Sequence, residues 1–357
     1  MKKWMCLFDA CVIVACIFIA LASFGEGGSS PIVQRISDSS YPTYVSEESA
    51  IVEAPTLIAP INDAKVFKGE GVVFEWSSVS GALKYMMSFS QTSDFIKQTK
   101  LFGDNKGAMV QSTMLSLLKN KTDGKYYWRA RASDKSNAQL NKDSDWGPWS
   151  SAGTFILTST YNIADYFPLS VGNQWNYTSG QNTITGTIQI NNETVFLYED
   201  ALCTCERESY LTVDERGILY WGNSKEGIYP QPFVLFQPTW KVGERKKIPF
   251  TIQVEDILKS GTLIFKLERL EDVTTPAGQF KNCLRFSVAI SSKGEHYENY
   301  KEVLHFARGI GLVRTERLKG DSPNSGCFFG IDPYYCCPTC NWTQELVSAV
   351  INGINIP

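Results

Sequence analysis

The chain has 357 residues, a length that suggests two domains. Apolar residues make up 43% and charged residues 20% of it, as in globular proteins with buried cores. The net charge is −3 and the Lys and Arg residues are scattered, so the basic stripe that nucleic-acid binding requires is missing, and this class of function is excluded.

The first 22 residues are predicted to be a signal peptide. Lys2 and Lys3 precede an apolar run from Cys11 to Phe24, and this run contains the small-residue motif "ALA" that signal peptidase cuts after. The run is shorter than the roughly 18–20 apolar residues of a membrane-spanning helix, so a retained anchor is the less favoured alternative. The mature protein is therefore expected to begin near Ser23 and to be extracytoplasmic, which means periplasmic, in the cell envelope or secreted.

A second alternative for this segment is a lipid anchor. The stretch "IVAC" resembles the lipobox of bacterial lipoproteins, with Cys16 as the lipidated residue. Lipoproteins normally become polar directly after this cysteine, whereas "IFIALASF" follows here, which favours ordinary secretion. Membrane contact of the mature chain is expected only through such an N-terminal anchor.

Changes in composition divide the exported chain. Residues 23–54 are rich in Ser, Gly, Pro and Glu and are predicted to be a flexible linker. Two all-β regions follow, at 55–159 and 160–320, and residues 321–357 are predicted to form a Cys-rich tail with a short helix. The helix is predicted because apolar residues recur at helical spacing in "NWTQELVSAVINGI", after a candidate capping box.

Residues 55–159 are predicted to form an antiparallel β-sandwich. Apolar residues alternate in "VVFEWSSV", "LKYMMSFSQ" and "KYYWRARA", which directs Trp76 and Trp128 into the core. This period of two, with Gly and Asp turns between the runs, is typical of a two-sheet sandwich. The Trp in the second strand, the "YYWRARA" strand and the closing "WGPWSSAGTF" resemble the bacterial form of the fibronectin type III family. The resemblance implies an immunoglobulin-like fold that serves as a spacer or docking module.

The "WGPWS" stretch is similar to the Trp-Ser-x-Trp-Ser box of cytokine receptors, in which, as the resemblance implies, tryptophans interleave with arginines of a neighbouring strand. Arg129 and Arg131 lie on the outer face of their predicted strand and are available to stack on Trp146 and Trp149. These four residues are predicted to form a structural cation–π ladder worth about 0.5–1 kcal/mol per exposed contact. A receptor or sugar-binding surface is the alternative.

Residues 160–320 are predicted to form a curved antiparallel sheet, either a half-barrel or a barrel. In "FKNCLRFSVAI", Phe280, Leu284 and Phe286 share one face, whereas Cys283 and Arg285 share the other. One apolar face and one polar face are typical of an antiparallel sheet that is wet on one side. So many consecutive short strands favour curling, because curling hides the apolar face.

Three motifs of this region, "YFPLSVGNQWNY", "TTPAGQFKNC" and "FARGIGLVRTE", resemble those of a bacterial family of exported β-proteins of unknown function, many of them lipoproteins. The resemblance covers about 160 residues and implies no catalytic residues, because none are established for the family. Each motif also predicts a local structure, with "GN" as a turn before a Trp, "PAG" as a hairpin, and "GIG" as a bulge or a close backbone approach.

Seven cysteines remain after the signal peptide, and in an oxidising compartment clustered cysteines are expected to form disulfides. The disulfide candidates are Cys203, Cys205, Cys327, Cys336, Cys337 and Cys340, and Cys283 is expected to stay free. Cys203 and Cys205 are too close to bridge each other without strain, so at least one bridge from them to the tail is expected. A redox Cys-x-x-Cys site and a four-thiol zinc site are the alternatives, but the first belongs to α/β folds and adjacent cysteines fit tetrahedral zinc poorly.

No arrangement of residues predicts catalysis. Only two histidines occur, His296 and His305, and neither accompanies a "GxSxG" elbow or another nucleophile motif. Their spacing places them on opposite faces of a strand, so they are not expected to share a metal. A pair of carboxylates that meets only in space, as in glycan hydrolases, is the weaker alternative.

These features predict a non-catalytic, exported bacterial envelope protein that needs no cofactor. It is expected to act as an interaction or structural module that contacts an unknown protein or a cell-envelope component. The alternative is a carrier that holds an apolar small molecule inside the second β-domain, and a glycan hydrolase is weaker still.

Overall fold

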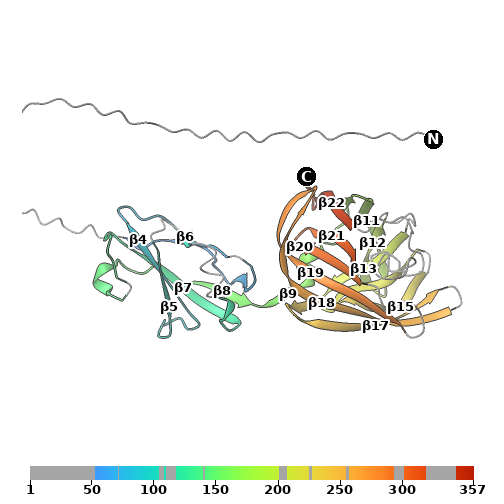
Figure 1. Cartoon of the computed structure of the whole chain (residues 1–357), viewed down its shortest axis with the longest axis horizontal. Helices are drawn as coiled ribbons and strands as arrows, with labels where there is room; N and C mark the ends of the chain where they lie inside the picture. The colour runs from blue at the N-terminus through green and yellow to red at the C-terminus, as the bar shows by residue number, and fades with distance from the viewer. Residues whose placement is uncertain are drawn as a thin grey trace, which may run out of the picture. The chain divides into compact units, whose positions relative to one another are not determined.

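The computed structural model of this chain describes residues 53–70, 72–103, 108–109, 118–139, 141–200, 207–224, 227–254, 257–292, 301–318 and 343–357. All of them belong to one compact unit, Ser49–Pro357. Within these ranges nearly every regular element is a β-strand, as predicted, and the strands form a two-sheet sandwich and a nearly closed barrel-like sheet (Figure 1). No helix in this part of the chain is long and apolar enough to cross a membrane.

The sandwich is built from the first eight strands. Their bounds are β1 Leu57–Ala59, β2 Ala64–Phe67, β3 Phe74–Trp76, β4 Lys84–Ser90, β5 Thr99–Gly103, β6 Ala108–Met109, β7 Gly124–Ser133 and β8 Gly153–Thr158, with a 3₁₀ turn, η1, at Asp143–Asp145. One sheet has the strand order β1-β3-β6, and the other has the order β2-β8-β7-β4-β5. Pairing is antiparallel except between β2 and β8, which are parallel.

The core of the sandwich is rich in aromatic rings. Trp76 and Trp128 are 2% and 0% exposed, so the predicted inward placement of both is confirmed. The ring of Trp128 meets that of Phe74 edge-on with a centroid distance of 5.0 Å, and its Nε1 donates to the carbonyl of Pro60 at 2.6 Å. Alternation assigns the inner face correctly here because the pleat of a strand sends successive side chains to opposite faces.

The remaining strands belong to the second half of the chain. They are β9 Thr160–Asn162, β10 Gln174–Tyr177, β11 Gly180–Ile190, β12 Glu193–Asp200, β13 Arg207–Asp214, β14 Gly217–Asn223, β15 Gly227–Phe236, β16 Thr239–Lys241, β17 Arg245–Val254, β18 Ile257–Thr275, β19 Gly278–Ser292, β20 Lys301–Ala307, β21 Gly311–Leu318, β22 Thr343–Ile351 and β23 Ile354–Ile356, with a 3₁₀ turn, η2, at Ile163–Tyr166. The barrel has the order β15-β14-β13-β12-β11-β10-β22-β21-β20-β19-β18-β17, and β23 pairs with β22 beside this path. All neighbours in it are antiparallel, which confirms the predicted curved sheet.

The predicted "PAG" hairpin and the predicted close approach at "GIG" both lie in connections between adjacent barrel strands. Thr275 pairs with Gly278 across the "PAG" turn between β18 and β19, and Gly278 has a φ of 120°. The "GIG" stretch joins β20 to β21, and a Cβ added at Gly311 would lie 3.1 Å from Nε1 of Trp175. The same Nε1 donates to the carbonyl of Ile310 at 2.6 Å, so the predicted close approach at this glycine is confirmed.

Proline residues mark the two edges of the barrel sheet. Pro230 and Pro232 lie in β15, and Pro249 lies in β17, the two strands at the ends of the order. Proline lacks the N–H that a central strand needs, so it is confined to edge strands. The edges β15 and β17 approach each other without pairing, which leaves the barrel nearly closed (Figure 1).

The prediction of a short helix in the C-terminal tail is wrong, because residues 343–351 form strand β22 between β10 and β21. Leu346 and Ala349 are both buried, and their spacing of three suggested a helix. The spacing arises from a register shift, since Tyr177 pairs with Leu346 whereas Trp175 pairs with Ala349. A β-bulge therefore changed the apparent period of the apolar residues.

Aromatic rings fill part of the barrel interior. We call Phe236, Trp240, Phe265, Phe286 and Phe306 the ring cluster; all five are fully buried. The centroids of Phe236 and Phe265 are 4.4 Å apart, and those of Trp240 and Phe286 are 5.0 Å apart. Phe286 also meets Phe306 edge-on at 6.1 Å. These distances are those of aromatic rings in direct contact.

A partly exposed ion pair joins the sandwich sequence to the barrel sequence. Nη2 of Arg308 is 2.7 Å from Oε1 of Glu70 and donates to the hydroxyl of Tyr166 at 2.8 Å. The guanidinium of Arg308 also lies 4.0 Å from the ring centroid of Phe67, which stacks on Tyr161. Burial raises the pKa of Glu70, while the charge of Arg308 opposes this shift.

Candidate functional site

The four residues of the predicted cation–π ladder lie together on the outer face of β7. The guanidinium carbons of Arg129 and Arg131 are each 4.3 Å from the ring centroid of Trp149, and that of Arg131 is 5.4 Å from Trp146. A fifth member, Phe95, lies 4.0 Å from Arg129 and was missed by the sequence analysis. It follows β4 in a turn with a positive φ of 58°, and no periodic pattern points to it.

The charges of this ladder are largely covered. The side chain of Arg131 is 5% exposed, and its Nη2 lies 2.9 Å from Oδ1 of Asp143. Burial and the neighbouring charge of Arg131 lower the pKa of Arg129, whose Nη2 donates to Gln98 at 3.3 Å. Two cations stacked on indole rings, one of them also paired with a carboxylate, stiffen the sheet. This arrangement favours the structural role over a binding surface.

A second charged arrangement lies on the outer face of the barrel. We call Glu268, Glu271, Arg285 and His305 the outer charge network. Nε2 of His305 is 2.6 Å from Oε1 of Glu271, and Nε of Arg285 is 3.4 Å from the same oxygen. Arg285 also forms an ion pair with Glu268. In the register of the sheet, Arg285 lies directly opposite His305.

His305 is buried, and burial disfavours its protonated form. Its side chain is 2% exposed, and burial lowers its pKa, although the carboxylate of Glu271 opposes this shift. Nδ1 has no hydrogen-bond partner among the described residues. A catalytic histidine needs both an orienting carboxylate and a nucleophile, and its described polar contacts are with a carboxylate. The described residues also contain no group of three His, Cys, Asp or Glu side chains suited to a metal.

Cys203, Cys205, Cys327, Cys336, Cys337 and Cys340 lie outside the described residues, as do His296 and residues 1–52 of the predicted signal peptide and linker. Cys283 is described as a free thiol, and burial raises its pKa to about 12.

The face assigned to Cys283 from alternation is wrong. Cys283 is 0% exposed and belongs to the barrel core, although Arg285 two positions later lies on the outer face. Asn282 has a φ of 53°, and the register shifts between Glu271 and Val273 on the opposite strand. This bulge turns the cysteine inward, which a strict period of two does not allow.

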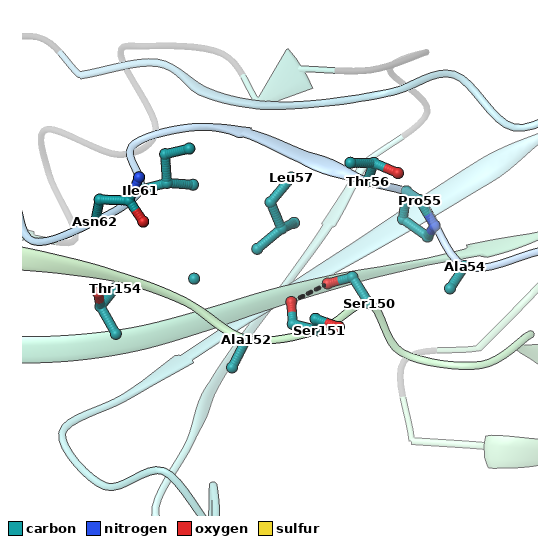
Figure 2. A pocket seen from close by; sticks show the side chains of 11 residues that line it. Ala54, Pro55, Thr56, Leu57, Ile61, Asn62, Ser150, Ser151, Ala152 and Thr154 are labelled. Carbon is teal, nitrogen blue, oxygen red and sulfur yellow. Dashed lines mark hydrogen bonds between the residues drawn. The ribbon is translucent and has the colours of Figure 1, made fainter.

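A shallow groove of about 410 Å³ lies on the sandwich (Figure 2). Side chains pack closely on Gly153, one of its lining residues, because a Cβ added there would lie 2.9 Å from Nε1 of Trp128 and 3.0 Å from Cδ1 of Leu57. A single hydrogen bond, from Oγ of Ser150 to the carbonyl of Ser151, connects lining residues in Figure 2. No charged side chain lines the groove, so it offers no acid or base. The lining residues are Ala54, Pro55, Thr56, Leu57, Ile61, Asn62, Ser150, Ser151, Ala152, Gly153 and Thr154.

Comparison with known proteins gives one match to a family model. A family model described as DUF3108-like matches residues 262–323, which contain most of β18 and all of β19, β20 and β21. The match includes two of the three motifs by which the barrel sequence resembles an exported family of unknown function, and it covers less than half of the chain. The resemblance of residues 55–159 to the fibronectin type III family stays a prediction.

No curated protein sequence matches this chain. Among solved structures, it is similar to a protein described as "a putative lipoprotein" from Parabacteroides distasonis ATCC 8503. The two chains are 14% identical, and the match covers 52% of this chain and 97% of the other with a TM-score of 0.26. A likeness this weak supports no inference about fold or function.

Proposed function

We propose that this chain is a non-catalytic, extracytoplasmic bacterial protein that works by contacting another protein or a cell-envelope component. The N-terminal signal-like sequence supports the location. The sandwich would serve as a spacer or docking module, and the outer surface of the barrel would make the specific contacts.

The observation that carries this proposal is the ring cluster. Its five fully buried rings contact one another in the barrel interior, so side chains occupy that space. A carrier of a large apolar molecule would need this space for its cargo. A filled interior therefore favours work done by the outer surface.

The surroundings of His305 support the absence of catalysis. Its Nε2 binds a carboxylate that Arg285 and Arg269 also contact, and its side chain is almost completely buried. A general base must come within hydrogen-bond reach of a substrate proton. Nε2 of His305 is already hydrogen-bonded to Glu271, whose carboxylate also forms ion pairs.

Two measurements on the exported protein test the proposal. First, native mass spectrometry of the full mature chain should give the mass of the polypeptide alone, without a copurified lipid. Second, a photo-crosslinking amino acid at Val347, which is 40% exposed on β22, should yield a discrete covalent adduct in cells of the source organism.

The crosslinker placed at Leu346, which is 0% exposed on the same strand, is the matched control and should yield no adduct. A copurified lipid that can be extracted in stoichiometric amount would overturn the proposal in favour of the carrier. Adducts that are equally frequent at both positions would overturn it too, because they would not depend on the outer surface.

A further inference from the structure

The groove on the sandwich lies between two segments of backbone. Residues 54–57, which lead into β1, lie on one side of it, and residues 150–154, which lead into β8, lie on the other (Figure 2). β1 is an edge strand, because the order of its sheet is β1-β3-β6. Residues 150–153 also have one open side, because β2 pairs with β8 only from Phe155 onward. Two strand edges that no other described strand covers therefore bound the groove.

The open edge of β1 presents the backbone groups of Leu57. Leu57 lies opposite Trp76, and next to this pair the N–H of Ser77 donates to the carbonyl of Thr56 at 2.8 Å. In an antiparallel pair, residues that bond to the partner strand alternate with residues whose N–H and C=O point away from it. Since Thr56 bonds to β3, the N–H and C=O of Leu57 point away from β3. Among the described residues, neither group forms a backbone hydrogen bond outside the pairing of strands.

The sequence of β1 does not protect this edge. Natural edge strands often carry a charge or a proline, which discourages the pairing of a further strand. The edge strands of the barrel contain prolines, whereas β1 is Leu-Ile-Ala, with neither a proline nor a charge. Ile58 on β1 and Ile61 beside the groove are 52% and 37% exposed. An unprotected edge with exposed apolar side chains is a template for another strand.

The lining of the groove limits what can occupy it. None of the lining side chains is charged, and several are small, such as those of Ala54, Ser151 and Ala152. The volume of about 410 Å³ lies in the range of roughly 300–1,000 Å³ that is typical of ligand sites. A strand edge recognises the backbone of an extended peptide, and neighbouring pockets select its alternate side chains. An uncharged peptide with a small apolar side chain directed at Leu57 and Ile61 fits these features, because a charge placed there would lack a partner.

We propose that this groove is a docking site for an extended, uncharged peptide segment of another protein, which adds a strand to the open edge of β1. The backbone of the segment bonds to the N–H and C=O of Leu57. Because β1 has three residues, only a short stretch of the partner pairs with it. This inference goes beyond the proposed function, which places the specific contacts on the barrel.

Fluorescence anisotropy on the mature full-length chain tests the proposal. The probe is a rhodamine-labelled peptide with blocked ends and the sequence Gly-Val-Thr-Val-Thr-Gly, which is uncharged and favours the extended conformation. Its binding should saturate, and N-methylation of its four central residues should abolish binding, because it removes the backbone donors. A photo-crosslinking amino acid at Ala152, which is exposed in the groove, should capture the probe. The same amino acid at Leu83, which is 51% exposed elsewhere on the sandwich, should not.

Two variants at one position isolate the backbone donor. Leu57→Ala and Leu57→Pro lose nearly the same side-chain packing, but only the proline removes the N–H. Leu57→Pro should bind the probe about fivefold more weakly than Leu57→Ala, which corresponds to the loss of one hydrogen bond. The two variants should melt at similar temperatures, because this N–H takes no part in the pairing with β3.

Four outcomes would overturn the proposal. They are the absence of binding, equal affinity of the two Leu57 variants, and a clearly lower melting temperature of Leu57→Pro, which would mean that its N–H serves the fold. The fourth is an adduct between the crosslinker at Ala152 and residues 23–52 of the same chain, which would make the chain's own preceding segment the occupant.

Discussion

The sandwich and the barrel close their cores in different ways. The sandwich buries its core between two sheets whose strands all lie between Leu57 and Thr158. The barrel buries its core inside one sheet, and its continuity depends on β10 near the start pairing with β22 at the end. The most distant strand pairing of the sandwich joins Ala64 to Phe155, whereas the barrel depends on contacts between segments more than 160 residues apart. The two regions should therefore respond to different perturbations.

The cysteines belong to only one of the two regions. Residues 55–159 contain none, and the seven cysteines from Cys203 onward all come later. The strand ends that adjoin the two cysteine-bearing segments all lie at the same end of the barrel. The end of β12 and the start of β13 lie there, and so do the end of β21 and the start of β22. A bridge between the two segments stays a prediction.

Reduction of the predicted disulfides should have the largest effect on stability, and it should destabilise the barrel alone. We expect three bridges among Cys203, Cys205, Cys327, Cys336, Cys337 and Cys340, at least one of them from Cys203 or Cys205 to the tail. A bridge that closes a loop of more than 100 residues contributes up to about 4–5 kcal/mol in the chain-entropy model. Scanning calorimetry with and without reductant should show that the barrel transition falls while the sandwich transition stays in place.

Alkylation without reduction, followed by peptide mapping, checks the pairing itself. A single thiol, that of Cys283, should become labelled, and only after denaturation, because it is buried and its raised pKa disfavours the thiolate. Label at tail cysteines that zinc protects, or a readily reducible Cys337–Cys340 bridge, would contradict the prediction.

Trp76→Ala should destabilise the sandwich and spare the barrel. Trp76 is 2% exposed, and truncation of a buried aromatic side chain costs about 3–5 kcal/mol. Trp146→Ala is the matched comparison, and it should cost about the 0.5–1 kcal/mol of its ladder contact plus some packing. Urea denaturation followed by hydrogen exchange of peptides from each region measures both. An unchanged midpoint for Trp76→Ala would refute its place in the core.

Ala349→Pro should open the barrel while the sandwich remains folded. Ala349 pairs with Trp175 on one side and Ile356 on the other, so a proline there removes a ladder hydrogen bond from a central strand. The expected cost is about 3 kcal/mol. Gln231→Pro in the edge strand β15 is the control, since it lies exposed between Pro230 and Pro232 and should be tolerated. If the melting curves of the two variants, followed by circular dichroism, coincide, the assignment of β22 as a central strand is contradicted.

Acidification should have the smallest effect on stability, and this effect should again fall on the barrel. Burial lowers the pKa of His305, so the unfolded chain binds a proton more readily than the folded chain. This contribution to stability is present above the ordinary histidine pKa of about 6.5 and is lost as the pH falls below it. The barrel melting temperature should thus decline on acidification, and His305→Gln should reduce the slope. An identical slope in the variant would exclude His305 as the cause.

Local patterns were enough for a large part of the fold. Alternation placed Trp76 and Trp128 in the core, because the pleat acts on each strand separately. The "PAG" hairpin and the close approach at Gly311 could likewise be predicted, because turn chemistry involves only a few adjacent residues. The four ladder residues were also recognised from neighbouring strands of one small region.

Other features depended on partners that the local pattern does not specify. Bulges gave residues 343–351 an apparent helical spacing and turned Cys283 inward, because a shift in register depends on the opposite strand. Phe95 joined the ladder through a turn without any periodic signal. Leu57 is an ordinary leucine in a short strand, and only the order of the sheet leaves its backbone groups on an open edge beside the groove. The sequence by itself determined the strands and most of their faces, whereas the tertiary structure decided which strands meet and what they enclose, since those contacts join residues far apart in the chain.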